Sequence, residues 1–283
     1  QRIGSNTSDD VRLVRGSHIV TRRLFDHDKC YFFQGSDGRI MFAIPYETDF
    51  TLIGTTDQEH HDLSQKPVCT LEEQRYMVDG VNAYLKTPIS EDDIVWTYSG
   101  VRPLYDDGAL SATAATRDYT IKLDKSAGAP ALNIFGGKIT TYRKLAESAL
   151  AIIGERLGAD SGPWTAGVAM PGGDFAVGDV GKLVTELRRD YDFLTGRWAL
   201  RLIRAYGIDA RRWLGTAKSA QDLGQDFGAT LTAAEVDWLM EKEFAETAED
   251  ILWRRSKLGL HKPDAAALDA YMTQRRSSIK DTA

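Results

Sequence analysis

The stretch of sequence that decides the fold is residues 131–145, ALNIFGGKITTYRKL. Its apolar first part predicts a β-strand, which the glycine pair Gly136-Gly137 then breaks. From Lys138 onward the apolar positions recur with helical spacing, at Tyr142, Leu145, Ala149 and Ile153. Glycines let a ligand approach the backbone closely, and the free N–H groups at a helix start attract negative charge. Together with the lysine, this turn predicts a pocket for an anionic or electron-rich ligand.

The same turn does not fit the loop that binds nucleoside triphosphates. That loop requires G-x-x-x-x-G-K-[ST], but Leu132 stands at the place of the first glycine and Ile139 follows Lys138. Taken alone, a Gly-Gly-Lys turn is as compatible with a solvated lysine as with a ligand site. The neighbouring segments favour the ligand site.

Six further segments accompany this turn. They are residues 11–20 (VRLVRGSHIV), 42–45 (FAIP), 53–57 (IGTTD), 92–96 (DDIVW), 99–103 (SGVRP) and 116–119 (TRDY). In this order, and followed by FGGK at 135–138, they closely resemble the flavin-dependent glycerol-3-phosphate dehydrogenases. The remainder is similar to the helical C-terminal domain of the bacterial members. The resemblance implies an α+β fold: a partial FAD-dependent oxidoreductase (DAO-like) substrate-binding sheet domain, followed by an all-α C-terminal domain.

The resemblance also implies roles for individual residues. Arg102 and Arg117 align with arginines that bind the substrate phosphate, and Lys138 aligns with the active-site lysine beside the flavin, so Lys138 and Arg102 are the expected catalytic residues. The backbone and side chains expected to meet FAD are those of Gly136, Gly137, Lys138, Ile139, Thr140 and Thr141. The implied reaction is oxidation of glycerol 3-phosphate to dihydroxyacetone phosphate, with hydride transfer to FAD and electrons passed to quinone.

The residues themselves leave two interpretations for Arg102 and for His18. A guanidinium fork binds a phosphate dianion bidentately, and Arg102 precedes Pro103, which we expect to end the strand. An isolated arginine of this kind is more often a surface or ion-paired residue. His18 is a candidate for the general base, although a histidine on a strand is more often structural. The sequence does not assign the base.

One family feature is missing from the sequence. Members of the family begin with a G-x-G-x-x-G strand-turn-helix that holds the FAD pyrophosphate, but Gly172-Gly173 and Gly178 lack this spacing. We therefore expect the chain to be the C-terminal part of a longer enzyme, whose N-terminal FAD-binding segment lies outside it. A Gly/Pro/Ser-rich stretch at 158–173 suggests two domains. These are a substrate-binding and partial FAD-binding domain over residues 1–160 and a helical domain over residues 161–283.

The expected elements follow from hydrophobic periodicity and end signals. Strands are expected at residues 11–20, 30–34, 39–45, 50–54, 94–101, 116–123 and 131–135. A helix is expected at 70–86, where Thr70 and Glu73 form a capping box, and another from Lys138 to about Leu157. Beyond residue 173 the β signals vanish. The helical signals there are the face shared by Leu183, Leu187 and Tyr191, and the helix starts at Thr232, Thr247 and Pro263.

Composition narrows the class of partner. The 283 residues carry a net charge of −6, with 42% hydrophobic and 27% charged residues, which is ordinary for a globular protein and argues against nucleic acid as a partner. Cys30 and Cys69 have no metal or disulfide spacing, so reduced thiols in the cytoplasm are expected. Because the family passes electrons to quinone, the resemblance implies an enzyme peripherally associated with the inner face of the cytoplasmic membrane, and a homodimer is compatible with it.

Four alternatives stay open. Residues 57–62 (DQEHHD) carry metal-ligand types, but their spacing fits no common ligand set, so we expect a solvated loop and no metal. Arg197, Arg201 and Arg204 predict a basic helical face that is solvated, meets another domain or touches lipid. The chain is also compatible with a glycerol-3-phosphate oxidase of the same fold, or with a non-catalytic fragment that binds phosphate or a protein.

Overall fold

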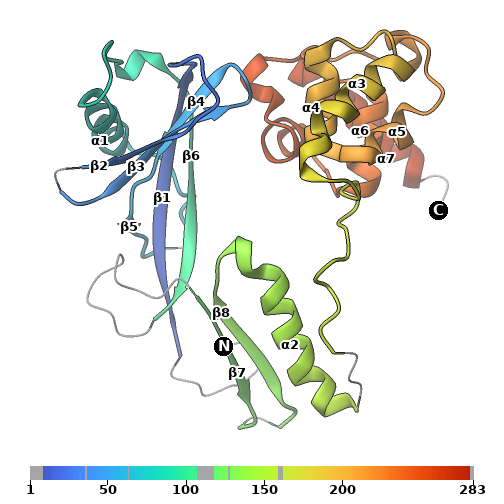
Figure 1. Cartoon of the computed structure of the whole chain (residues 1–283). Coiled ribbons are helices and arrows are strands. Elements are labelled where there is room, and N and C mark those ends of the chain that lie inside the picture. The colour runs from blue at the N-terminus through green and yellow to red at the C-terminus, as the bar shows by residue number, and fades with distance from the viewer. Residues whose placement is uncertain are drawn as a thin grey trace. The chain divides into compact units, whose positions relative to one another are not determined.

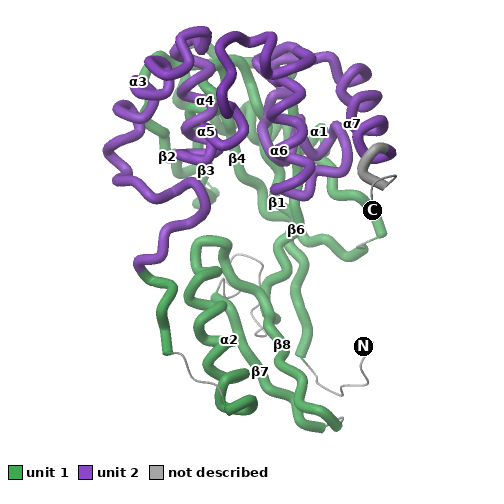
Figure 2. The backbone as a smooth tube through the Cα atoms, turned by 90° about the vertical axis from the view of Figure 1, so that its right-hand side faces the viewer, with its two compact units in different colours: residues 1–166 green, residues 167–283 purple. Residues whose placement is uncertain are grey.

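The computed structural model of the chain describes residues 9–35, 37–62, 64–106, 118–126, 128–158 and 162–280. The chain forms two compact units, residues 1–166 and residues 167–283, which Figure 2 colours separately. Unit 1 contains the sheets together with two longer helices, whereas unit 2 is built of helices. The α+β fold class, with a sheet region followed by a helical region, is therefore confirmed.

The main sheet of unit 1 is antiparallel and is centred on one long strand (Figure 1). Its strands are β1 (Val11–Arg22), β2 (Tyr31–Gln34), β3 (Ile40–Tyr46), β4 (Phe50–Gly54), β5 (Gln58–Glu59) and β6 (Ile94–Tyr105). The strand order is β2-β3-β4-β1-β5, and β6 also pairs with β1. The strands expected from alternating hydrophobicity are confirmed, with small differences at their ends.

Pro103 does not end its strand, contrary to expectation, because β6 continues to Tyr105. Pro103 lies opposite Leu13 of β1, and the Leu13 carbonyl accepts a 2.9 Å hydrogen bond from the amide of His60. The hydrogen-bonding groups of Leu13 thus face β5 and not β6, so the missing N–H of proline removes no bond from the β1–β6 ladder. Arg102 consequently lies within a strand.

Helix α1 (Leu71–Asn82) packs on one face of this sheet and ends a turn earlier than expected. Thr70 and Glu73 form the predicted capping box: the Thr70 hydroxyl accepts from the Glu73 amide, and the Glu73 carboxylate accepts from the Thr70 amide. The core between helix and sheet consists of Ile19, Phe33, Met41, Ala43, Ile53, Met77, Val78 and Val81. The opposite face of the sheet is therefore the one available for a site.

The remaining part of unit 1 is the hairpin of β7 (Tyr119–Asp124) and β8 (Ala131–Gly136), followed by helix α2 (Tyr142–Leu157). Figure 1 shows α2 alongside β8. Between them lies the 3₁₀ turn η2 (Ile139–Thr141), where a regular α-helix start was expected. Residues 116 and 117, at the start of the expected strand 116–123, lie outside the described residues.

Unit 2 has its own hydrophobic core. Its helices are α3 (Val180–Asp190), α4 (Gly196–Tyr206), α5 (Ala210–Leu214), α6 (Ala233–Lys242), the π-helical η6 (Asp250–Arg255) and α7 (Ala265–Lys280). Leu187, Leu202, Leu239 and Leu268 are fully buried in it. None of the described helices in either unit has the length and apolar character needed to cross a membrane.

The prediction that Arg197, Arg201 and Arg204 form one basic face of α4 is wrong for Arg201. Arg197 and Arg204 are exposed, but Arg201 faces Glu235 of α6, which is completely buried. The two terminal nitrogens of Arg201 donate to the two carboxylate oxygens at 2.6 and 2.7 Å, and the Tyr206 hydroxyl donates to the same carboxylate at 2.6 Å. A bidentate ion pair inside unit 2 thus joins α4 to α6.

Candidate functional site

One face of the β1–β6 ladder collects charged and aromatic side chains. Three alternate pairs of the register lie on this face: Val14 with Arg102, Gly16 with Gly100, and His18 with Tyr98. Residues that face each other across a ladder, and residues two apart on a strand, point to the same side of a sheet. The register therefore brings Arg102 and His18 together from distant parts of the sequence.

The Arg102 side chain lies across the backbone of β1 and reaches the segment that follows β4. A Cβ atom at Gly16 would come within 2.5 Å of its Nη2 atom, so the glycine leaves the space that the guanidinium occupies. Nη1 pairs with the carboxylate of Asp57, and Nη2 lies 3.4 Å from the Thr55 hydroxyl. With 33% of its side-chain surface exposed, Arg102 is held by the protein while part of it still faces solvent.

His18 is the second ionisable group on this face. Its ring stacks on Tyr98 with centroids 4.9 Å apart and planes within 7° of parallel. A Cβ atom at Gly54, its partner on β4, would collide with the imidazole. The buried Nδ1 atom has no hydrogen-bond partner among the residues that the structure describes. Burial, reinforced by the charge of Arg102, lowers the pKa of His18 to about 4, so the ring is neutral near pH 7.

We expect this histidine to make unit 1 less stable in mild acid. Its pKa is about 4 in the folded chain and 6.5 ordinarily, so between these values the unfolded chain binds more protons. The free energy of unfolding therefore falls as the pH falls from 6.5 toward 4, which thermal unfolding across this range measures. His18→Gln should lose much of this dependence, whereas His61→Gln, at an exposed ring, should keep it. Identical pH dependence in all three proteins would contradict the assignment.

The Gly136-Gly137-Lys138 turn lies against the strand that carries Arg102. Both glycines have left-handed backbone conformations, with φ of 65° and 98°. A Cβ atom at Gly136 would lie 3.2 Å from the Tyr105 amide nitrogen and 3.7 Å from the Pro103 carbonyl oxygen. The predicted strand, glycine break and helix are confirmed, and the break approaches β6 one residue beyond Arg102.

The remaining residues that were predicted to contact FAD or substrate are mostly exposed. Lys138, Ile139 and Thr140 are exposed, and 85% of the Ile139 surface is accessible. The Thr141 hydroxyl donates a 2.9 Å hydrogen bond to the Lys138 carbonyl, so it contributes to the turn itself. Arg117, the second arginine predicted to bind phosphate, lies outside the described residues.

The expectation of a solvated loop at residues 57–62 is wrong for its first four residues. Asp57 pairs with Arg102, Gln58 and Glu59 form β5 against β1, and His60 is buried. Within the described ranges, no group of three or more His, Cys, Asp or Glu residues has an arrangement that could hold a metal ion. Asp57, Gly16 and Gly54 are thus site residues that sequence reasoning missed. The sequence indicated them only through the family-like segments that contain them, VRLVRGSHIV for Gly16 and IGTTD for Gly54 and Asp57.

Two protein families and several curated proteins are similar to this chain. Residues 2–143 match the family described as FAD dependent oxidoreductase, and residues 164–272 match the C-terminal domain of alpha-glycerophosphate oxidase. The chain is 45% identical to a glycerol-3-phosphate dehydrogenase of Pseudomonas aeruginosa, over 88% of this chain and 49% of that protein. It is 43% identical to the aerobic glycerol-3-phosphate dehydrogenase of Escherichia coli, over 88% of this chain and 50% of that protein.

A third relative has a different named substrate. The D-erythritol 1-phosphate dehydrogenase of Brucella abortus is 39% identical, over 92% of this chain and 52% of that protein. Among solved structures, the glycerol-3-phosphate dehydrogenase from Bacillus halodurans complexed with FAD matches with a TM-score of 0.74 and 25% identity, over 90% of this chain and 50% of that chain. The chain thus spans about half the length of the curated relatives it matches.

Proposed function

Because this chain belongs to the family of FAD-dependent oxidoreductases, we propose that it is the substrate-binding side of a flavoenzyme that oxidises glycerol 3-phosphate to dihydroxyacetone phosphate. The observation that carries the proposal is the juxtaposition of Arg102 with the neutral, partly buried His18 on one face of the sheet. A phosphate dianion calls for a guanidinium fork, and oxidation of an alcohol calls for a group that accepts the hydroxyl proton.

The proposed roles follow from these two requirements. Arg102 binds the substrate phosphate together with Arg117, and Lys138 adds a positive charge at the neighbouring turn. The imidazole of His18, which is neutral near pH 7, is the proposed acceptor of the proton of the C2 hydroxyl. When bound, FAD supplies the electron acceptor for the oxidation.

The Gly136–Thr141 turn fits a flavin ring. Gly137 has a left-handed backbone and is exposed, and Ile139 offers an exposed apolar surface close to it. Apolar side chains continue along the hairpin and α2, where Ile134, Tyr142, Leu150, Ile153 and Leu157 are also exposed. An apolar set of this extent normally packs against another domain. We propose that an N-terminal FAD-binding segment, outside these 283 residues, covers it.

The 283-residue chain alone is therefore expected to purify without colour and without dehydrogenase activity. The FAD pyrophosphate is normally held at a glycine-rich strand-turn-helix, and no G-x-G-x-x-G occurs in this sequence. The visible absorbance spectrum and an assay with an artificial dye acceptor test this expectation. Stoichiometric flavin absorbance, or turnover of glycerol 3-phosphate by this chain, would refute it.

Gly16→Ala is expected to raise the KM for the phosphorylated substrate in the FAD-loaded full-length enzyme. The added methyl group meets the far end of the Arg102 side chain, which swings away while the sheet stays intact. The cross-strand neighbour provides a matched control, because a Cβ atom at Gly100 would have no atom within 4 Å. Steady-state kinetics should thus show a higher KM for Gly16→Ala and an unchanged one for Gly100→Ala. Equal KM values in both variants would remove Arg102 from substrate binding.

The decisive experiment for the function uses the FAD-loaded full-length protein. Bleaching of the flavin spectrum by glycerol 3-phosphate, and not by glycerol, is the expected result, because Arg102 recognises the phosphate. Faster bleaching by D-erythritol 1-phosphate would assign the substrate of the Brucella abortus relative instead. Rapid reoxidation by oxygen would indicate an oxidase. Absence of any spectral change would leave a non-catalytic phosphate-binding fragment.

We further propose quinone as the acceptor, a homodimer, and a peripheral location on the inner face of the cytoplasmic membrane. A membrane-dissolved acceptor requires an enzyme that reaches the bilayer surface, and the word aerobic in the name of the Escherichia coli relative is consistent with respiratory electron transfer. Co-sedimentation of the full-length protein with quinone-containing vesicles, together with reduction of that quinone, tests the acceptor and the location.

A further inference from the structure

We propose that the segment Thr55-Thr56-Asp57 positions the Arg102 guanidinium for the substrate phosphate, and that the buried Glu73 of α1 anchors this segment. The inference rests on the proposed role of Arg102 in phosphate binding. The segment follows β4 directly and leads into β5, so it crosses beside the β1–β6 ladder at the level of Gly16.

The three residues of the segment point alternately to its two sides. Thr56 is buried, and its hydroxyl donates a 2.7 Å hydrogen bond to Glu73. Its neighbours both contact Arg102, Asp57 through an ion pair with Nη1 and Thr55 through its hydroxyl, 3.4 Å from Nη2. Successive side chains of an extended segment point in opposite directions. Fixing Thr56 on one side therefore fixes both contacts with Arg102 on the other.

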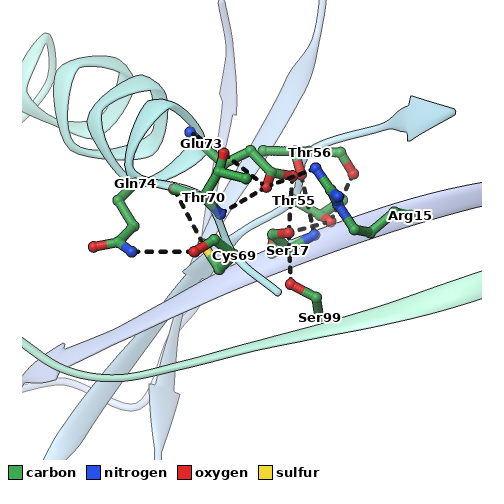
Figure 3. A network of polar contacts seen from close by, with 9 residues as sticks. All are labelled: Arg15, Ser17, Thr55, Thr56, Cys69, Thr70, Glu73, Gln74 and Ser99. Atoms are coloured by element: carbon green, nitrogen blue, oxygen red, sulfur yellow. Dashed lines mark hydrogen bonds and ion pairs between the residues drawn. The ribbon is translucent and has the colours of Figure 1, made fainter. Parts of the chain in front are cut away.

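The Thr56 hydroxyl both donates and accepts a hydrogen bond (Figure 3). Its hydroxyl oxygen accepts from the Ser17 amide at 3.0 Å while its hydrogen goes to Glu73. A hydroxyl that donates and accepts at once has little rotational freedom. The anchor is thus a directional contact and not merely a packed methyl group.

The carboxylate of Glu73 is held in place by several hydrogen-bond donors. Besides Thr56, it accepts hydrogen bonds from the Ser17 hydroxyl at 2.8 Å, from the Thr70 amide at 2.9 Å and from Arg15 at 3.1 Å. Burial raises the pKa of this carboxyl group, but the hydrogen bonds from Thr70, Thr56 and Ser17 outweigh it, and the net pKa is lowered. The carboxylate is therefore charged, and a buried charge satisfied by several donors resists displacement.

This arrangement matters because a free arginine side chain must be ordered before it can bind a phosphate in a bidentate manner. Ordering a long side chain opposes binding, and a fork that is already oriented avoids most of that cost. Asp57 and Thr55 engage the two terminal nitrogens, and Gly16 leaves room for the guanidinium plane. The substrate thus meets a preoriented cation.

Thr56→Val, which keeps the shape but removes the hydroxyl, tests the anchor in the FAD-loaded full-length enzyme. We expect the KM for glycerol 3-phosphate to rise about tenfold with little change in kcat, since the phosphate contact serves substrate and transition state alike. Thr56→Ser, which restores the hydroxyl, should return the KM to near the wild-type value. Thr51→Val is the matched control: Thr51 is equally buried and its hydroxyl accepts from the Leu24 amide, away from Arg102.

Asp57→Glu provides a second test that does not depend on the folding of Thr56→Val. It keeps the charge but moves the carboxylate by one methylene, so it should also raise the KM and should raise the dissociation constant of inorganic phosphate for the 283-residue chain. An unchanged KM in Asp57→Glu, or an equal rise in Thr51→Val, would overturn the inference. A wild-type KM in Arg102→Ala would instead overturn the proposed function, so the two failures are distinguishable.

Discussion

Arg102→Ala is expected to lower kcat/KM for glycerol 3-phosphate in the FAD-loaded full-length enzyme by roughly 30- to 1000-fold, or ~2–4 kcal/mol of transition-state binding. The substitution removes the guanidinium fork that is proposed to hold the phosphate. It also takes the cation away from the Asp57 carboxylate, so negative charge is left at the place where the dianion should bind. Both effects weaken binding of the substrate phosphate.

Two comparisons separate recognition of phosphate from a general loss of structure. Arg102→Lys keeps the charge but not the planar fork, so its kcat/KM should lie between those of the wild type and Arg102→Ala. Both variants should still bind FAD and still unfold cooperatively, because neither change touches the Gly136–Thr141 turn. Near wild-type kcat/KM in Arg102→Ala would show that this arginine is structural, and Arg117→Ala would then carry the test of phosphate recognition.

Elements specified by neighbouring residues were predictable from the sequence. The capping box of Thr70 and Glu73 starts α1 where expected, and Gly136-Gly137 separates β8 from the turn before α2. In both places a few adjacent residues satisfy the local backbone, so no distant part of the chain is needed to predict the structure. The α+β class followed from these local patterns and from the family resemblance.

The contacts within the candidate site were not predictable in the same way. Arg102 was identified as a phosphate ligand, but its contacts with Asp57 and Gly16 depend on the register of β1 with β6 and on the course of the chain after β4. Register is a long-range property that no single segment encodes. Glu73 illustrates the same limit, because the capping motif gave its backbone role and not its bond to Thr56.

Arg201 shows a further reason why periodicity misleads. A pattern of polar and apolar residues assigns every arginine to the solvent-facing side of a helix, whereas a long side chain can bury its stem and pair its head group inside the protein. Arg201 does so because Glu235 is placed opposite it on α6. The sequence separation between the two residues hides the pair from any helical pattern.

Glu235→Gln is accordingly expected to destabilise unit 2 by ~3–5 kcal/mol, the scale for breaking a buried ion pair by removing one partner. The glutamine keeps the volume but takes the Glu235 counter-charge away from the partly buried Arg201, and it weakens the acceptor of the Tyr206 hydroxyl. Denaturant unfolding of the full chain measures this, with the fluorescence of Trp198, Trp213, Trp238 and Trp253 reporting on unit 2. The transition of unit 2 should move to lower denaturant while that of unit 1 stays in place.

Two further variants test whether an uncompensated buried charge causes the loss of stability in Glu235→Gln. One alters an ion pair on the surface, and the other replaces both partners of the buried pair. Glu249 pairs with Arg254 at 2.9 Å, but both side chains are more than half exposed, so Glu249→Gln should leave the unfolding midpoint unchanged. Replacing both Arg201 and Glu235 with methionine removes the isolated charge along with the pair, and this double variant should be more stable than Glu235→Gln. If instead the double variant were the least stable protein of the set, the hydrogen bonds of Arg201 to Thr230 would be the main contribution to stability. The ion pair itself would then be close to neutral, because the cost of taking two charges out of water would cancel their attraction.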